Sequence, residues 1–387
     1  MLRSSVLGAC ARGGGACGVA ALMLSMVGLL AGLPQRACAA EAMPPEIPFD
    51  SVPDFFKLPP DLYLGEVAGI AVNSQHHIFI YTRGNSTGPA YGAAAAQLLE
   101  FDQNGNYLRE IGHHLYAWAF AHSVRIDPQD NIWVADKGSD MVVRFNPQGR
   151  VTMVFGRKPE ASDEEAHPLE HPKPPLPPSD GTFRQVTDMT FDTDGNVYVS
   201  DGYINSRVAK YDREGNWVGT WGTPGSGPGQ LHTPHSIAVD HENRIYVADR
   251  GNRRIQVFDT SGNVLSIIHI DVPAPPNAPV VLGRRPNLTS DGHAGTPEGG
   301  DSWYEPGAPW TLCITPGRTQ YLYVSDAFPG RIYKLSLDGK VLGWLGRAGH
   351  QLKQFGWIHA IACPSENELY VGELLNWRAQ KLILHPR

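Results

Sequence analysis

The sequence feature that most constrains the fold is a two-strand pattern that occurs six times. In its clearest copy, from Ser236 to Asp249, an apolar strand is followed by a polar turn, a second apolar strand and an aspartate. The six copies begin at Gly69, Ser123, Asp188, Ser236, Thr311 and Ala360. Units that contain only strands and recur in this way indicate a radial β-structure, in which neighbouring units cover each other's faces.

Each copy is followed by a third apolar strand, and five copies are followed by a fourth. The expected fourth strands are Tyr107 to Ile111, Val151 to Phe155, Trp217 to Trp221, Val264 to Ile268 and Val341 to Leu345. We therefore predict an all-β fold, a six-bladed β-propeller built from residues 67–387. A sandwich is the alternative, but it does not require groups of four strands that share one motif.

The sixth repeat has no fourth strand of its own in the printed sequence. An unpaired sheet edge favours association with other chains. We therefore expect the segment 40–66 to close the ring, with residues around Asp54 to Lys57 as the missing strand.

Residues 1–39 have the features of a secretory signal peptide. Arg3 and Arg12 precede an apolar run from Val19 to Leu33, and Ala37-Cys38-Ala39 forms a cleavage site of small residues. The run is shorter than the roughly 20 residues of a membrane-spanning helix. We expect an exported protein, periplasmic or extracellular, that has no membrane segment after cleavage.

The formal net charge is -7, with both signs interspersed along the chain. This pattern argues against nucleic acid or an anionic membrane surface as the partner. Outside the predicted signal peptide only Cys313 and Cys363 remain. They lie in the first strands of their repeats but one position out of phase, so we expect them on opposite sheet faces, without a disulfide.

Three insertions interrupt the repeats, at residues 84–96, 158–181 and 271–309. In a four-stranded antiparallel blade, the start of the first strand, the end of the second and the link to the next blade all lie on one face. All three insertions are therefore expected on that face. Loops gathered on one side of a rigid scaffold often carry function.

One slot, two residues before the first apolar position of each inner strand, alternates between histidine and other residues. The six residues at this slot are Ala68, His122, Thr187, His235, Trp310 and His359. The chain has 15 histidines in 387 residues, about one position in 26, so three at alternate equivalent slots are not expected by chance. Inner strands line the central channel, and alternate blades are a third of a turn apart.

Three imidazoles from these positions converge on the axis of the ring. A site of three histidines with open positions is typical of catalytic zinc, which acidifies a bound water. Taken singly, each histidine is equally well explained by a hydrogen bond to the backbone at the channel mouth. The trio favours a divalent metal.

The slots that directly follow the second strands lie on the same face and include Arg83, Lys137, Tyr203 and Arg250. An arginine can clamp a carboxylate, and a tyrosine beside a cation can serve as an acid or base. Spacing alone leaves catalytic and structural roles open for Tyr203 and Arg250. For Lys137 it favours a solvated loop residue.

The aspartates at the ends of the second strands recur in nearly every repeat: Asp136, Asp201, Asp249 and Asp326. That regularity indicates a structural role, in which each carboxylate accepts hydrogen bonds from N–H groups of turns.

The repeat resembles the NHL family, and the stretch from Val67 to Glu373 resembles the peptidyl-alpha-hydroxyglycine alpha-amidating lyases. These enzymes cleave their substrate to a peptide amide and glyoxylate. The resemblance is carried by QVTDMTFDTDGNVYVSDGYINSRVAKY, PGQLHTPHSIAV and IHAIACPSENELYVGE, and it is most specific in the SDGY and PHS segments.

The resemblance implies that His122, His235 and His359 bind zinc and that Tyr203 is the catalytic tyrosine. The two active-site arginines of the family fall on Arg83, which would hold a substrate carboxylate, and Arg250, which would lower the pKa of the tyrosine. The expected activity is that of a secreted zinc-dependent lyase. Its substrate would be a small or peptide-like molecule with an alpha-hydroxyglycine-type centre.

Two departures concern the scaffold. The family has an aspartate directly after the third zinc histidine, and this aspartate binds a structural calcium ion together with main-chain carbonyls. In this chain those carbonyls would belong to Val67 and Val124, but the position of the aspartate is occupied by Ala360. Without the carboxylate a calcium site is doubtful. The family also has a disulfide cysteine where this chain has Ile204.

Two other functions are compatible with the sequence. One is a different metal-dependent lyase or a lactonase-like hydrolase that uses the same axial site. The other is a non-catalytic recognition propeller, since this fold serves many roles.

Overall fold

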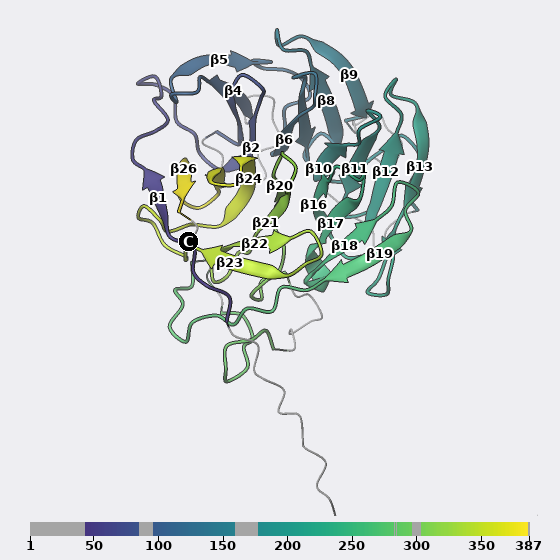
Figure 1. Cartoon of the computed structure of the whole chain (residues 1–387). Coiled ribbons are helices and arrows are strands. Elements are labelled where there is room, and N and C mark those ends of the chain that lie inside the picture. Colours follow the sequence, from purple (N-terminus) through teal and green to yellow (C-terminus); the bar gives the residue numbers. More distant parts are fainter. Residues whose placement is uncertain are drawn as a thin grey trace, which may run out of the picture. The chain divides into compact units, whose positions relative to one another are not determined.

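The structure is a computed structural model that describes residues 43–84, 96–158, 177–281, 283, 285–295 and 303–385. The predicted signal peptide and most of the insertions at 84–96 and 158–181 lie outside the described residues. Within residues 43–387 six four-stranded antiparallel sheets stand as blades around a central channel (Figure 1). The predicted six-bladed β-propeller is confirmed. No helix among the described residues is long and apolar enough to cross a membrane.

In blades one to five the strands follow the order of the chain from the channel outward. Blade one consists of β2 (Val67–Val72), β3 (Ile78–Thr82), β4 (Gln97–Phe101) and β5 (Tyr107–Ile111). Blade two consists of β6 (Ala121–Ile126), β7 (Ile132–Asp136), β8 (Met141–Phe145) and β9 (Val151–Gly156). Blade three consists of β10 (Asp188–Phe191), β11 (Val197–Asp201), β12 (Arg207–Tyr211) and β13 (Trp217–Trp221). Blade four consists of β16 (Pro234–Val239), β17 (Ile245–Asp249), β18 (Arg254–Phe258) and β19 (Val264–Ile268). Blade five consists of β20 (Leu312–Ile314), β21 (Tyr321–Ser325), β22 (Ile332–Ser336) and β23 (Val341–Leu345). A short parallel pair, β14 (Thr223–Pro224) and β15 (Gln230–Leu231), precedes blade four, and a 3-10 turn covers Arg250–Asn252.

The sixth blade joins the two ends of the described chain. Its strands β24 (Ile358–Ser365), β25 (Glu368–Glu373) and β26 (Arg378–Leu384) are completed by β1 (Phe49–Val52), which pairs antiparallel with β26. The predicted location of this strand, Asp54 to Lys57, was wrong by a few residues. The apolar residues there, Phe55 and Phe56, instead pack against Tyr370 and Phe101, between blades six and one.

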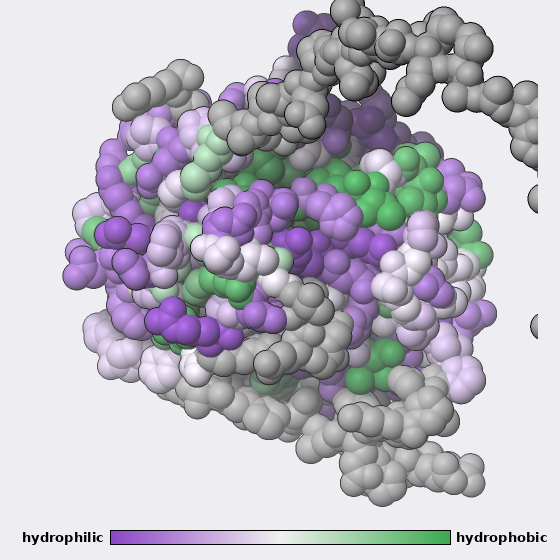
Figure 2. All heavy atoms as spheres, turned by 90° about the horizontal axis from the view of Figure 1, so that it is seen from below, coloured by the Kyte–Doolittle hydropathy of each residue, from purple (hydrophilic) through white to green (hydrophobic). Residues whose placement is uncertain are grey.

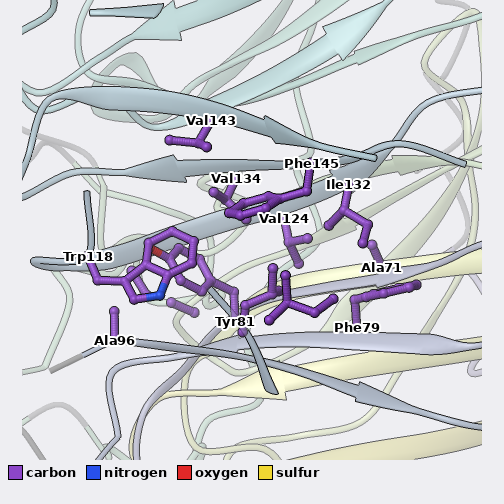
Figure 3. Packing of buried hydrophobic residues seen from close by; sticks show 14 of the residues in the cluster. Ala71, Phe79, Tyr81, Ala96, Trp118, Val124, Ile132, Val134, Val143 and Phe145 are labelled. Atoms are coloured by element: carbon purple, nitrogen blue, oxygen red, sulfur yellow. The ribbon is translucent and has the colours of Figure 1, made fainter. Parts of the chain in front are cut away.

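The blades bury both faces of their second strands, which explains the apolar sequence of these strands. All five residues of β3, β7 and β17 are buried, whereas β9 and β13 at the rim are largely exposed or half-buried. Side chains of neighbouring blades interdigitate, as Tyr81 of blade one does with Trp118, Val134 and Phe145 (Figure 3). Burial between blades therefore stabilises the ring.

The outer surface is mixed in character. Figure 2 shows one side of the molecule, on which hydrophilic residues predominate and hydrophobic residues form patches between them. Large exposed apolar side chains occur on the outermost strands, for example Val151, Val218 and Leu265.

A disulfide joins Cys313 of β20 to Cys363 of β24, and the prediction that they would not pair was wrong. The two cysteines are one position out of phase in their repeats, so they point to opposite faces of their own blades. Adjacent blades, however, meet with opposite faces. The same phase difference therefore brings the two side chains together between blades five and six.

The aspartates at the ends of the second strands bind turns, as predicted. The carboxylate of Asp136 accepts hydrogen bonds from the backbone N–H groups of Ala119, Phe120, Gly138 and Ser139 at 2.9–3.0 Å. This network joins the end of β7 to the residues just before His122. It thereby fixes the entry of the inner strand into the channel.

Candidate metal centre

Three histidines meet at the axis of the ring, each near the start of an inner strand. His122 lies in β6, His235 in β16 and His359 in β24, and one ring nitrogen of each lies within 4.8 Å of the others. Their side chains are buried. The structure thus brings together the three residues singled out by the alternating slot, and the cluster can bind a metal ion.

Each imidazole is oriented by a carbonyl of the following blade. Nδ1 lies 2.6 Å from the Thr187 carbonyl oxygen in His122, 2.7 Å from that of Trp310 in His235, and 2.8 Å from that of Ala68 in His359. A carbonyl only accepts, so Nδ1 carries the hydrogen and the Nε2 lone pair is left for a metal.

The three acceptor residues occupy the slots without histidine. The alternation of histidine with other residues at this slot therefore has a structural reason. Each blade that carries a histidine is followed by a blade whose slot residue accepts the histidine hydrogen bond through its main-chain carbonyl. Alignment of the repeats alone does not reveal this pairing. Burial lowers the pKa of all three histidines well below 6.5, and nearby positive charge lowers it further. The imidazoles are neutral at neutral pH, which is the form that ligates metals.

Tyr203 reaches the same point from blade three. Its hydroxyl oxygen lies 3.1 Å from Nε2 of His235 and 3.3 Å from Nε2 of His122. The preceding residue, Gly202, passes so close to the chain that a Cβ atom would lie 2.0 Å from the Pro234 carbonyl oxygen. Glycine in the SDGY segment is therefore required for the tyrosine to approach β16.

The electrostatic surroundings of Tyr203 favour its ionised form. Burial raises the pKa of the phenol, but the positive charges of Arg250, Lys137 and Arg83 outweigh burial and lower it from 10.0. A phenol whose pKa is lowered in this way, beside three neutral imidazoles, can serve as a base if a metal ion is bound.

The two arginines differ in how their charge is balanced. Arg83 Nη1 forms an ion pair with Glu66 at 2.7 Å, and Nε donates to the Ala121 carbonyl at 3.0 Å. Arg250 packs its guanidinium 4.2 Å above the ring of Trp310, and its buried Nε and Nη1 have no hydrogen-bond partner. Arg250 therefore presents unpaired donors in the site.

Lys137 is part of the site, and its interpretation as a solvated loop residue was wrong. Its Nζ lies 4.0 Å from the centre of the Tyr203 ring and 5.1 Å from that of Phe120. Burial lowers its pKa from 10.5, and the nearby Arg83 and Arg250 also lower it. Its slot, which it shares with Arg83, Tyr203 and Arg250 in other blades, was the signal that pointed to it.

Three tryptophans, Trp303, Trp310 and Trp357, pack together beside the histidines, and the sequence did not predict this group. The ring centres of Trp310 and Trp357 are 4.8 Å apart, and Trp303 of the third insertion lies 6.4 Å from Trp357. Trp310 also lies 4.8 Å from the His235 ring. In blades five and six the slots of Arg83 and Tyr203 are held by Ala327 and Leu374, so the surroundings divide into a cationic half and an apolar half.

Below the histidines the channel is filled by an ion pair. Arg125 of β6 pairs through both Nε and Nη2 with the two carboxylate oxygens of Asp188, at 2.9 Å for Nε. Nη2 also donates to Ser236 Oγ at 3.1 Å and the Leu312 carbonyl at 3.2 Å. One side chain of blade two thus ties together blades three, four and five.

These residues do not fit a structural calcium ion. Ala360 offers no side-chain oxygen, and of the expected carbonyl ligands Val124 lines the channel whereas Val67 does not. The remaining space between the histidines and Arg125 is about 10 Å³, and a guanidinium already supplies the positive charge. Calcium binding by the main-chain carbonyls of Val67 and Val124 therefore stays an untested prediction.

Comparison with known proteins agrees with this architecture. The NHL repeat family matches residues 231–258. The chain is 31% identical over 226 residues, 52% of its length, to a peptidyl-glycine alpha-amidating monooxygenase of Mus musculus. It is 26% identical over 51% of its length to a probable peptidyl-alpha-hydroxyglycine alpha-amidating lyase of Caenorhabditis elegans.

The matched region is only part of these relatives, 21% of the mouse protein and 57% of the nematode protein. Among solved structures, a gluconolactonase of Xanthomonas campestris matches with a TM-score of 0.51 and 14% identity, over 89% of this chain and 99% of that one. At that identity the match shows the fold alone. The chain thus contains an NHL repeat and is similar to alpha-amidating enzymes, as its sequence motifs indicated.

Proposed function

We propose that the protein is an exported zinc-dependent lyase that cleaves the carbon–nitrogen bond of an alpha-hydroxyglycine-type centre to an amide and glyoxylate. The observation that carries this proposal is the position of the Tyr203 hydroxyl, within 3.3 Å of imidazole nitrogens of both His122 and His235. The similarity to alpha-amidating enzymes supports it.

The donor set is the reason for choosing zinc. His122, His235 and His359 would hold the ion through neutral Nε2 atoms, and three such ligands with an open position are typical of catalytic zinc. Bound zinc would polarise the hydroxyl oxygen of the substrate. The carbonyls that orient each Nδ1 keep the three nitrogens directed at one point.

Tyr203 is the base in this proposal. Its phenolate accepts the proton of the substrate's carbinol hydroxyl, and the electron pair of that O–H bond forms the carbonyl of glyoxylate. The carbon–nitrogen bond breaks in the same direction, and its electron pair stays on nitrogen. The nitrogen then takes up a proton to give the amide, so that atoms and charge balance.

The arginines have separate tasks in this proposal. Arg250 holds the pKa of Tyr203 below its ordinary value, against the effect of burial. Arg83, paired with Glu66 and bonded to the Ala121 carbonyl, holds the start of β6 beside blade one, so that its charge is largely balanced within the protein.

The same proposal covers location and substrate. Residues 1–39 have the pattern of a signal peptide, and the Cys313–Cys363 disulfide is suited to an oxidising compartment outside the cytoplasm. The substrate is a small or peptide-like molecule that carries a carboxylate, and the net charge of -7 makes nucleic acid an unsuitable partner.

The test is metal analysis of the purified protein together with incubation with N-benzoyl-alpha-hydroxyglycine. We expect zinc to co-purify, benzamide and glyoxylate to appear in equal amounts, and a chelator to abolish turnover until zinc is restored. His235→Ala should lose both metal and activity. The control is His241→Ala, since His241 follows the other end of the same strand and contacts the Gly317 carbonyl.

Two results would count against the proposal. A protein that purifies without metal from zinc-containing medium would favour a recognition propeller. Metal-loaded protein that hydrolyses lactones but releases no glyoxylate would favour a hydrolase.

A further inference from the structure

We infer that Lys137 is a substrate-binding residue that, together with Arg250, forms a subsite for the carboxylate next to the reacting carbon. The inference rests on the proposed function and deepens it, because it names the residues that bind the substrate carboxylate. Neither the metal trio nor the residues implied by similarity include Lys137.

The position of Lys137 is set by its surroundings on both sides. It directly follows Asp136, its backbone N–H donates to the Phe120 carbonyl at 2.9 Å, and the next N–H groups bind the Asp136 carboxylate. The side chain then extends over two aromatic rings, with Nζ 4.0 Å from the centre of the Tyr203 ring. Contacts of this kind hold a cation in place without neutralising it.

The charge of Lys137 has no carboxylate counter-ion among the described residues, and the anion it faces is the Tyr203 phenolate of the proposed function, which it shares with Arg250. No carboxylate in the described part of the chain lies within 4.0 Å of Nζ, whereas Arg83 beside it is paired with Glu66. The acidic group with the largest effect on the pKa of Lys137 is Tyr203, and Asp140, whose effect is smaller, has its own pKa raised to about 8 by burial. Two cations, Lys137 and Arg250, therefore share one phenolate, and a bound anion would offset the cost of the remaining positive charge.

Arg250 supplies the second half of the subsite. Its Nε and Nη1 are buried and unpartnered, while its guanidinium packs on Trp310 and lies 5.3 Å from the centre of the Tyr203 ring. These two N–H groups lie on different edges of the guanidinium, so a carboxylate oxygen can accept a hydrogen bond from either of them. Lys137 Nζ and the Arg250 guanidinium lie 4.0 Å and 5.3 Å from the centre of the same Tyr203 ring, so one anion beside that ring can contact both.

Tyr203 connects this subsite to the metal centre. Both cations contact its ring, and its hydroxyl faces the histidine nitrogens. A carboxylate bound by the cations therefore has its attached carbon beside the hydroxyl. This spacing fits an N-acyl-alpha-hydroxy acid, in which the carboxylate is bonded directly to the reacting carbon, and disfavours the corresponding amide or ester.

The test measures binding without turnover, so that it is independent of the proposed reaction. Zinc-loaded protein is titrated with N-acetylglycine, which lacks the reacting hydroxyl, and with the neutral N-acetylglycinamide, and tryptophan fluorescence is recorded. We expect wild type to prefer the carboxylate. Lys137→Met should weaken binding of N-acetylglycine at least about tenfold and leave N-acetylglycinamide unchanged.

Two further variants make the test specific. Lys137→Arg should keep most of the preference for the carboxylate. Lys210→Met should behave as wild type, since Lys210 also lies over a tyrosine, 5.3 Å from the Tyr198 ring centre, but donates to the Thr260 carbonyl. Zinc content and melting temperature establish that each variant is folded.

The inference is overturned if Lys137→Met binds both probes as wild type does. With a turned-over substrate, Lys137→Met should raise KM by a larger factor than it lowers kcat. A fall in kcat and a shifted pH profile, with unchanged affinity for N-acetylglycine, would show instead that Lys137 acts only through Tyr203.

Discussion

The hydroxyl oxygen of Tyr203 lies 3.1 Å from Nε2 of His235, although the two residues belong to different blades. The Nδ1 atom of His235 donates to the Trp310 carbonyl, so its Nε2 atom is directed toward the axis and the phenol meets it there. Tyrosine and histidine are thus placed against one point by separate parts of the scaffold. Replacing either one need not displace the other.

Replacing the phenol should therefore separate chemistry from metal binding. Tyr203→Phe keeps the ring that Lys137 and Arg250 contact but removes the acid–base group. We expect the rate of glyoxylate release to fall by about 10²–10⁴ while zinc content stays the same. Steady-state kinetics and metal analysis check this.

The matched control for that variant is Tyr198→Phe. The Tyr198 hydroxyl donates to Asp192 at 2.8 Å in the adjacent turn and does not contact the histidines. It should lower stability and leave kcat nearly unchanged. Full activity in Tyr203→Phe would remove the tyrosine from the chemistry.

The Arg125–Asp188 pair should stabilise the ring in place of a metal. Arg125→Met leaves the buried Asp188 carboxylate without a cation, which should lower the free energy of unfolding by about 3–5 kcal/mol. The double variant Arg125→Met/Asp188→Asn should recover most of that loss. Denaturant unfolding measures both.

The same pair predicts calcium independence. Neither millimolar calcium nor a calcium-selective chelator should shift the unfolding midpoint of the wild-type protein, because the channel already contains a guanidinium. A stabilisation by calcium would contradict this reading of the channel.

The disulfide should contribute to stability by restricting the unfolded chain. Cys313 and Cys363 are 50 residues apart, and closing a loop of that length corresponds to about 4 kcal/mol in the chain-entropy treatment. We expect Cys313→Ser/Cys363→Ser to unfold at lower denaturant concentration. Wild-type protein with its disulfide reduced should unfold at the same denaturant concentration as the variant. A difference between the two would show that the serine side chains themselves caused the loss of stability.

Asp140 should make stability depend on pH. Burial raises its pKa to about 8, with the charges of Asp201 and Asp136 adding to the shift, compared with 3.8 for a free carboxyl. Because the folded state holds the proton more tightly than the unfolded state, the stabilising effect is complete below pH 3.8 and is lost as pH rises towards 8.

Asp140→Asn removes this ionisation. Asparagine tolerates the positive φ of 56° at this position and can still accept the hydrogen bond from the Gln185 N–H. The variant should equal wild type near pH 4 and exceed it near pH 9, by at most on the order of 5 kcal/mol. Unfolding curves across this range measure the difference, and the exposed Asp338→Asn should show no such trend.

Much of the ring was predictable because its strands repeat locally. The five predicted fourth strands begin where expected, and the alternating slot identified His122, His235 and His359 before any contact was known. The closing strand was misplaced because Phe55 and Phe56 are more apolar than Phe49–Val52, which contains Asp50 and Ser51. Only their packing between blades six and one separates the two segments.

The sequence by itself determined the number of blades, the order of their strands and the three histidines, since these follow from comparing each repeat with the others. Only the tertiary structure decided the Cys313–Cys363 disulfide, the ion pair of Arg125 in the channel, and the place of Lys137 over Tyr203. Each of these joins different blades. Alignment of repeats places residues within a blade, whereas contacts between blades depend on how opposite faces meet around the ring.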